Sequence, residues 1–294
     1  MLKQPQAQLT NATPLVSIYI PTKDRPQLLR RALASCLQQS YQQLEIIVVD
    51  DGSAAEFQPV IDQLCQQDAR IRLVRNATSL GAPASRNRAI TQARGMYITG
   101  LDDDDEFTPQ RVQGFISQRA LLDQHAFLCS GYQVQQQRGR YRYAKRSAPI
   151  SLQQLLFANH VGSQIFTLTQ RLQQIGGFDP QLSSCQDYDT WLRLVQQFGP
   201  GFRLAEQSYI LHQDHTQSRI TDSPRVAEGY QRLLAKHQHL MSKAQYRTQC
   251  LNLKLLHGQV SVAEILTLPL SQQWRFFKVL AVSRLNTIRK GKNS

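Results

Sequence analysis

The first hundred residues alternate short apolar runs with stretches in which apolar side chains recur every three or four positions. The apolar runs at 16–20, 44–49, 71–75 and 96–101 predict β-strands, and the stretches between them predict helices. The second run is wholly apolar over its last four residues, as expected of a strand buried on both faces. This repetition is typical of a mainly parallel central sheet flanked by helices, so the predicted fold class is α/β.

The first predicted helix begins at Pro26, because proline suits the first helical position. Apolar residues at helical spacing would turn one side of this helix toward the sheet. They are Leu29, Leu33, Cys36 and Leu37. Further helices are predicted over 56–66, 83–93 and 108–122.

The rhythm changes past residue 125. An antiparallel pair is expected around Arg138 and Gly139, and the chain is expected to be helical from about residue 222. The elements predicted between these points are strands at 127–137, 140–145, 163–168 and 209–212, and helices at 152–157 and 187–198.

Composition narrows the class of protein. The chain has 294 residues, 41% of them hydrophobic, which suits a folded domain with an appendage. Five widely spaced cysteines without a CxxC pair argue against a disulfide framework or a zinc site, so we expect a reducing, cytoplasmic location. The start lacks the apolar core of a signal peptide, and no 18 consecutive apolar residues occur that would span a membrane.

Charge is concentrated at one end of the chain. The net charge is +13. From Arg225 onward the chain has twelve Lys and Arg residues but only two acidic residues. Such a tail favours an anionic surface, either phospholipid or nucleic acid. Over 271–290, apolar residues at helical spacing predict a helix with one apolar side. They are Trp274, Phe277, Ala281, Leu285 and Ile288. Such a helix would either lie on the cytoplasmic face of the inner membrane or pack on the rest of the chain.

Acidic residues cluster where two predicted strands end. Asp50 and Asp51 follow the second strand, and five consecutive acids, 102–106, follow the fourth. In open α/β sheets ligands bind at that edge. Neighbouring carboxylates repel one another, so a positive partner is expected, and Mg²⁺ or Mn²⁺ suits hard oxygen ligands. The alternatives are a solvated acidic loop for 102–106 and a simple turn for Asp50 and Asp51.

Four blocks in order resemble the family 2 glycosyltransferases. They are 16–22, 48–53, 84–88, and 101–105 with Pro109. The resemblance implies the glycosyltransferase A fold, in which a nucleotide-sugar-binding half meets an acceptor-binding half in one sheet. The implied division is a lead-in at 1–14, a catalytic domain at 15–221 with halves 15–124 and 125–221, and a basic helical C-terminal extension at 222–294.

The resemblance also assigns donor contacts. Pro21 and Thr22 match the turn that lines the nucleobase, and Asp24 lies in the same turn. Asp51 matches the carboxylate that accepts a hydrogen bond from a uracil-like ring, which fits an ionised group that can only accept. Arg86 matches a basic residue near the donor, and its planar guanidinium is suited to binding phosphate.

The resemblance places the metal site in the acid run. Asp104 matches the direct metal ligand, Asp102 and Asp103 lie toward the ribose and the metal, and His215 matches a histidine near the metal or the diphosphate. A divalent ion would act as a Lewis acid on the departing nucleoside diphosphate.

The acceptor side is expected to carry the general base. Asp187 matches the family's catalytic carboxylate, and Gln186 departs from the glutamate that is usual before it. A neutral neighbour removes one like charge that would have raised the pKa of Asp187. Sugar choice is assigned to loops around 129–132, 159–164 and 183–186.

The predicted function is an inverting, metal-dependent transfer of a sugar from a nucleotide sugar, a UDP-sugar, to a hydroxyl of a lipopolysaccharide, capsule or other surface glycan, which can be lipid-linked. One alternative is a nucleotidyltransferase, but the first strand is followed by residues 21–25 rather than a glycine-rich phosphate loop. The other is a nucleic-acid or anionic-surface binding module, which the pI of 9.8 suggests. Nucleic acid is not an expected partner, because no DNA-binding motif is found.

Overall fold

The computed structural model describes residues 13–137, 139–143, 146–162, 164–213, 225–256, 259–274 and 276–277. In chain order the strands are β1 (Val16–Thr22), β2 (Leu44–Asp50), β3 (Ile71–Arg75), β4 (Tyr97–Gly100), β5 (Glu106–Phe107), β6 (Leu128–Gln136), β7 (Gly139–Tyr143), β8 (Ala148–Ile150), β9 (Phe166–Leu168) and β10 (Gly201–His212). The helices are α1 (Pro26–Leu37), α2 (Gln58–Cys65), α3 (Ala82–Gln92), α4 (Arg111–Ser117), α5 (Leu152–Phe157), α6 (Thr169–Gln174), α7 (Gln186–Phe198), α8 (Arg225–His237), α9 (Lys243–Leu256) and α10 (Val262–Leu266), with short 3₁₀ turns η1 (Arg119–Asp123) and η3 (Gln238–Leu240).

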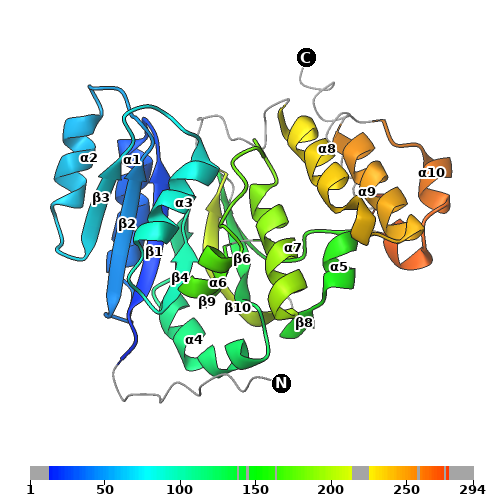
Figure 1. Cartoon of the computed structure of the whole chain (residues 1–294), viewed down its shortest axis with the longest axis horizontal. Coiled ribbons are helices and arrows are strands. Elements are labelled where there is room, and N and C mark those ends of the chain that lie inside the picture. The colour runs from blue at the N-terminus through cyan, green and yellow to red at the C-terminus, as the bar shows by residue number, and fades with distance from the viewer. Residues whose placement is uncertain are drawn as a thin grey trace.

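One continuous sheet runs through the described part of the chain, in the order β3-β2-β1-β4-β9-β6-β10-β5 (Figure 1). β3, β2, β1 and β4 are parallel. β9 is antiparallel to both β4 and β6, and it thereby joins the first half of the sheet to the second. β6 is parallel to β10, while β7, β8 and β5 add antiparallel pairings. The predicted α/β class and the single sheet are confirmed.

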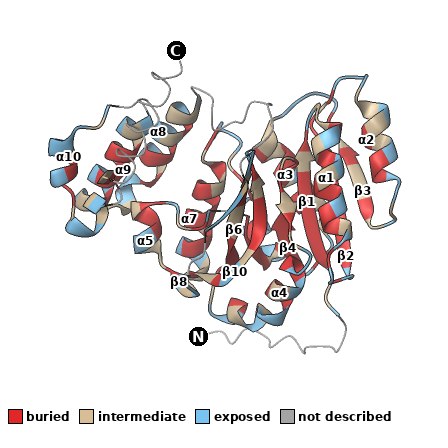
Figure 2. Cartoon of the chain, turned by 180° about the vertical axis from the view of Figure 1, so that it is seen from behind, coloured by how far each residue is buried: buried red, intermediate tan, exposed pale blue. Residues whose placement is uncertain are grey.

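Helices cover both faces of the sheet, and the strands are buried between them (Figure 2). In β2, Ile46 and Val48 pack into one hydrophobic cluster with residues of α1, α2 and α4. Ile47 and Val49 point the other way, into a second cluster with residues of α3, α6 and α7. Because alternate side chains of a strand face opposite sides, an unbroken apolar run is what this position in the sheet requires.

The sequence predicted most elements of the first half, and their ends differ by only a few residues. It missed α6, β8 and the first part of β10. β10 is interrupted by a change of register between Leu204 and Tyr209, where Glu206 and Gln207 break the apolar pattern. A bulge of this kind removes the alternation by which a strand is found in a sequence.

The C-terminal region is helical where it is described, as expected, and it packs on α5 and α7 (Figure 1). The apolar stripe predicted over 271–290 lies mostly outside the described residues, which end at Phe277. None of the described helices is both long enough and apolar enough to cross a bilayer. The division into 15–221 and 222–294 stays a prediction.

Candidate active site

The carboxyl ends of β1, β2 and β4 meet at one edge of the sheet, as parallel pairing requires. Thr22, the last residue of β1, connects both neighbours. Its carbonyl accepts a 2.8 Å hydrogen bond from the amide of Asp51, and its Oγ1 donates a 2.8 Å hydrogen bond to Oδ2 of Asp103. Three of the predicted donor-site residues, Thr22, Asp51 and Asp103, therefore lie together.

Asp51 is buried, and both of its carboxylate oxygens accept hydrogen bonds from the 76–85 segment. The donors are Nδ2 of Asn76, the amide of Leu80 and Oγ of Ser85 to Oδ1, and Oγ of Ser79 and the amide of Gly81 to Oδ2. Burial alone would raise the pKa of Asp51, but these hydrogen bonds hold it below its ordinary value. Asp51 thus fixes the loop that leads into α3, and its contact with a nucleobase stays a prediction.

The turn after β1 is hydrogen-bonded to the turn after β2. Asp24 has a positive φ of 56°, which is uncommon for a residue with a side chain. Its amide donates to Oγ of Ser53 at 2.9 Å, and its Oδ1 accepts from the amide of Ala54 at 2.7 Å. Pro21 lies in β1, opposite Val49. Asp24 is therefore held in a strained conformation at the edge where the acids gather.

Arginines are the positive partners of the acid run in this structure. Nη1 of Arg25 lies 3.4 Å from Oδ1 of Asp103 and 3.9 Å from Oδ2 of Asp104. Nε of Arg31 lies 3.5 Å from Oε1 of Glu106. Burial raises the pKa of Asp103 to about 7, although Arg25 and the Thr22 hydroxyl oppose the shift. Arg25 and Arg31 are therefore positive partners of the acid run, in addition to the divalent ion that the sequence predicts.

Arg86, which is buried, forms an ion pair with the half-buried Asp102 at this edge. Nη2 of Arg86 donates to Oδ1 of Asp102 at 2.7 Å, and its guanidinium carbon lies 5.3 Å from the centre of the Phe178 ring. Burial alone would lower the pKa of Arg86, but the charge of Asp102 raises it above the ordinary value. Nε and Nη1 of Arg86 are buried without a hydrogen-bond partner among the described residues. Two donors of this cation are therefore left for a ligand.

The acid run offers the ligand type that a divalent ion prefers. Asp102 keeps a third of its side chain exposed, at 34%, and Asp104 follows two residues later. Among the residues described, no three His, Cys, Asp or Glu side chains form a ready metal cluster. Mg²⁺ commonly takes only one or two carboxylates and completes its shell with water and substrate phosphates. His215, the third predicted ligand, lies outside the described residues.

Tyr19, Gln164 and Arg111 support Asp102 through a chain of hydrogen bonds, and the sequence analysis singled out neither Tyr19 nor Arg111. The hydroxyl of Tyr19 donates to Oε1 of Gln164 at 3.0 Å, and Nε2 of Gln164 donates to Oδ1 of Asp102 at 3.4 Å. The buried guanidinium of Arg111 donates to the carbonyl of Gln164 at 2.8 Å. Gln164 belongs to a loop expected to bear on sugar choice, but nothing in the pattern of β1 marked Tyr19.

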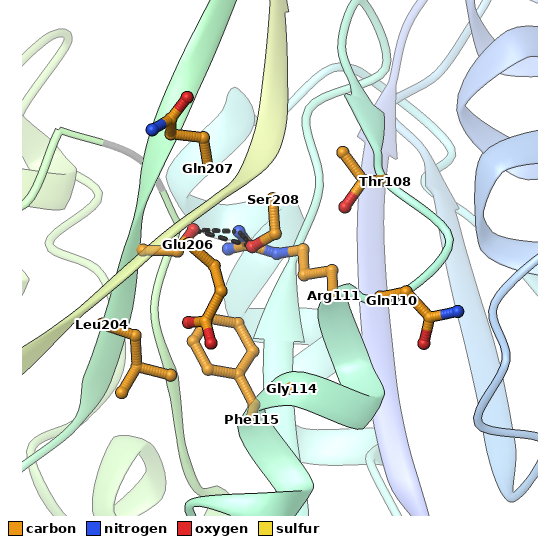
Figure 3. A pocket seen from close by; sticks show the side chains of 10 residues that line it. Thr108, Gln110, Arg111, Gly114, Phe115, Leu204, Glu206, Gln207 and Ser208 are labelled. Atoms are coloured by element: carbon orange, nitrogen blue, oxygen red, sulfur yellow. Dashed lines mark hydrogen bonds between the residues drawn. The ribbon is translucent and has the colours of Figure 1, made fainter. Parts of the chain in front are cut away.

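A cavity of about 170 Å³ lies between α4 and the strands β6 and β10 (Figure 3). None of the predicted catalytic, donor-binding or metal-binding residues lines it, although Ser130 belongs to the 129–132 loop that was expected to bear on sugar choice. Its buried wall includes Arg111, which donates to the hydroxyls of Ser130 and Ser208, and burial lowers the pKa of this guanidinium to about 10. The cavity therefore lies behind the site, on the far side of the residues that support Gln164.

Asp187 is the second residue of α7, and Cys185, which immediately precedes the helix, has a left-handed φ of 59°. Burial raises the pKa of Asp187 above its ordinary value, and the amide of Tyr188 and the charge of Arg86 oppose that shift. The charge of Asp102 raises it further. The predicted base is thus close enough to Arg86 and Asp102 to interact electrostatically with both.

Two neighbours of Asp187 matter for the acceptor side. Gln186 is buried, and its Oε1 has no hydrogen-bond partner in the described part of the chain. Asp189, two residues after the base, is fully buried and lies 2.8 Å from Nε2 of His237 and 2.9 Å from Nζ of Lys236, both on α8. The start of α7 is therefore in contact with the C-terminal helices.

The chain is similar to known proteins in both sequence and structure. The model of the family described as "Glycosyl transferase family 2" matches residues 17–179. Among curated proteins, the chain is 38% identical over 248 residues to the putative colanic acid biosynthesis glycosyl transferase WcaA of Escherichia coli (strain K12), which covers 82% of this chain and 87% of that protein. It is 29% identical over 192 residues to the putative teichuronic acid biosynthesis glycosyltransferase TuaG of Bacillus subtilis (strain 168), covering 64% and 75%.

Solved structures share the fold. One is TarS 1-349 of S. aureus in complex with UDP-GlcNAc, with a TM-score of 0.63 at 16% identity over 90% of this chain and 79% of that one. Another is the mannosyltransferase PcManGT from Pyrobaculum calidifontis in complex with GDP-Man and Mn²⁺, with a TM-score of 0.62 at 14% identity over 94% and 81%. Both are similar in the arrangement of the sheet and its helices.

Proposed function

The chain belongs to glycosyl transferase family 2, and from this premise we propose that it is an inverting, metal-dependent glycosyltransferase that uses a UDP-sugar as donor. The acceptor is a hydroxyl of a bacterial surface glycan. The first part of this statement, that the chain is a glycosyltransferase, follows from its family. The metal, the donor nucleotide, the stereochemistry and the acceptor form the proposal.

The proposal is supported by the ion pair of Arg86 with Asp102 and by the electrostatic effect of both charges on the carboxyl of Asp187. Arg86 and Asp102 come from the half that resembles a nucleotide-sugar site, and Asp187 comes from the other half. Burial raises the pKa of Asp187, with Asp102 adding to the shift and Arg86 opposing it. A general base works best when its pKa approaches the working pH, so a raised carboxyl pKa suits proton removal from an alcohol.

In the proposed reaction Asp187 takes the proton from the acceptor hydroxyl as the oxygen attacks the anomeric carbon. Attack from the side opposite the leaving diphosphate inverts that carbon. Asp102 and Asp104 would hold Mn²⁺ or Mg²⁺, which as a Lewis acid stabilises charge on the diphosphate. Arg86 contributes the N–H groups of Nε and Nη1 to the same negative charge.

The proposed acceptor rests on the relatives, whose names refer to colanic acid and teichuronic acid biosynthesis. Both names describe polysaccharides, so we assign this chain to surface-polysaccharide synthesis with a lipid-linked glycan as acceptor. A location on the cytoplasmic face of the inner membrane would bring the enzyme to such an acceptor.

The C-terminal helices support that location. Of the large hydrophobic side chains that are exposed in the described chain, most lie between residues 246 and 274. They are Tyr246, Leu256, Val262, Leu266, Leu270 and Trp274. An exposed apolar concentration beside a basic tail suits binding to an anionic bilayer. Flotation of the full chain with vesicles of phosphatidylglycerol, compared with phosphatidylcholine vesicles, tests it, and equal recovery with both would contradict it.

The donor experiment uses purified full-length protein with UDP-, GDP-, dTDP- and CMP-sugars, with Mn²⁺ or with EDTA, and measures binding and nucleotide release. The proposal requires selection of a UDP-sugar that depends on the metal and is lost in Asp104→Asn. Selection of a GDP-sugar would overturn the assignment of UDP as the donor nucleotide, but not the proposed metal, stereochemistry or acceptor. No binding of any nucleotide sugar, together with tight salt-sensitive binding of DNA or RNA, would favour a nucleic-acid module instead.

A further inference from the structure

The residues on both sides of Asp187 are held by the C-terminal helices rather than by the catalytic half alone. Before the base, Oγ of Ser184 donates to the carbonyl of Val226 on α8 at 3.2 Å. After the base, Asp189 is in contact with Lys236 and His237 near the end of the same helix. α8 therefore contacts the segment at two points that bracket Asp187.

The approach of α8 to Ser184 requires a glycine. A Cβ at Gly229 would lie 2.9 Å from the backbone N and O of Ser184, and 2.2 Å from its Oγ. Backbone atoms at such distances cannot be accommodated without a shift. Glycine costs roughly 0.5–1 kcal/mol relative to alanine inside a helix, so its presence in α8 needs a packing reason, which this contact supplies.

α9 adds a third contact, on the residue next to the base. Nε2 of Gln249 donates to the hydroxyl of Tyr188 at 2.9 Å and to the carbonyl of Leu156 at 2.8 Å. The Tyr188 hydroxyl also donates to the carbonyl of Leu155. Gln249 thus links the start of α7 to α5 through a buried network, and such networks restrict side chains to one arrangement when every member is satisfied.

We propose that α8 and α9 act as a positioning element for the general base, with Gly229, Lys236 and Gln249 fixing the segment Ser184–Asp189 and thereby the place of Asp187. The inference rests on the proposed role of Asp187. Cys185 begins α7 in a left-handed conformation without a side-chain cap, so the start of the helix does not fix itself. Contacts from outside must hold it.

The experiment compares Gly229→Ala with Gly114→Ala in the full-length protein. Gly114 is the matched control, because a Cβ there meets no atom within 4 Å and the residue also lies inside a helix. The assay is release of nucleoside diphosphate from the UDP-sugar that the donor panel selects, as a function of pH. A second readout is amide hydrogen exchange of the peptide that covers 184–190.

We expect Gly229→Ala to lower kcat at least tenfold, with the donor KM within twofold, and to speed exchange in 184–190. The ascending limb of kcat against pH should also shift, since the groups that face Asp187, namely Arg86, Asp102, Tyr19 and Cys185, would lie at new distances. Gly114→Ala should leave all three quantities unchanged. Wild-type kcat with unchanged exchange in Gly229→Ala overturns the inference, as does a lower kcat without a shifted pH limb.

A second pair of variants keeps the test decisive if Gly229→Ala does not fold. Lys236→Met removes the charge beside Asp189, while Lys236→Arg retains it. The inference expects a lower kcat and a shifted pH limb for the first and near-normal behaviour for the second. Equal activity of both would overturn it. If Asp187→Asn itself turns over normally, the proposed function fails instead, and the two failures are thereby distinguished.

Discussion

Arg86 and Asp102 pair at 2.7 Å on neighbouring elements, with the guanidinium of Arg86 buried against the ring of Phe178 from the second half of the chain. Asp102 is one of the acids that are proposed to bind the metal, and both charges of the pair act on the pKa of Asp187, the carboxylate that is proposed to activate the acceptor. The site uses the planar fork of an arginine, because Nη2 of Arg86 donates to Asp102 while Nε and Nη1 have no hydrogen-bond partner among the described residues.

Substitution of Arg86 by methionine or by lysine should lower kcat/KM for the donor by at least about tenfold, because neither side chain replaces the fork. The measurement is steady-state kinetics with the selected UDP-sugar. Arg94→Met is the control, since it removes the same charge from an exposed position two residues beyond α3. Wild-type kcat/KM in Arg86→Lys would show that charge alone suffices.

Asp187→Asn should lower kcat by a factor of about 10²–10⁴, the usual contribution of a general base. It should also stabilise the protein near neutral pH. The pKa of Asp187 is raised in the folded state, so its ionised form destabilises the fold, and that penalty develops as pH rises above the unfolded-state pKa. Denaturant unfolding at pH 7 measures the second effect. A less stable Asp187→Asn protein would contradict the environment described for this carboxyl.

The contribution of Asp189 to the stability of the fold should depend on pH in the opposite direction. Burial alone would raise its pKa, but His237, Arg193 and Lys236 lower it to about 2 from the ordinary 3.8. A depressed carboxyl pKa stabilises the fold above the unfolded-state value and loses that effect as pH falls toward 2. The shift corresponds to about 2 kcal/mol.

Asp189→Asn should therefore be less stable than the wild type at pH 6, and the difference should shrink between about pH 4 and pH 2. Urea unfolding of both proteins across that range measures it. A difference that stays constant down to pH 2 would mean that the ion pairs of Asp189 do not contribute through its charge.

Gly100→Ala should destabilise the protein by about 1–3 kcal/mol or more, as overpacking of a core does. A Cβ at Gly100 would lie 2.3 Å from ring atoms of Tyr19, whose ring is fully buried and cannot move aside. Because the Tyr19 hydroxyl holds Gln164, activity should fall as well. Thermal unfolding and donor turnover are compared with Gly114→Ala, which should be at least as stable as the wild type. Equal stability of the two variants would contradict the contact.

The sequence predicted the first half of the fold well because each buried parallel strand there is a continuous apolar run that ends in polar residues. The same logic predicted that Thr22, Asp51 and Asp103 would meet, since the carboxyl ends of parallel strands share one edge. It did not predict that β9 would join β4 to β6 and so link the two halves of the sheet. Antiparallel β9 is only three residues long, and its pairing with β4 depends on packing that no local pattern expresses.

The partners within the site were harder to predict than the site itself. Arg25 was visible as part of a turn, but its pairing with Asp103 follows from the left-handed Asp24 that precedes it. Tyr19 reads as one apolar residue of a buried strand, and only the approach of Gln164 from 145 positions later makes its hydroxyl informative. The roles of Asp51, Asp104 and Asp187 in catalysis stay predictions until the variants are measured.

Asn87 determines how freely the two halves could be exchanged among related enzymes. Its Nδ2 donates to the carbonyl of Phe178 and its Oδ1 accepts from the amide of the same residue, both at 2.7 Å, while Gly177 leaves the space that the amide group occupies. A hybrid that joined residues 1–124 to the acceptor half of another protein would need both this amide and the glycine facing it. Exchange of either half would therefore have to preserve the two hydrogen bonds between Asn87 and Phe178.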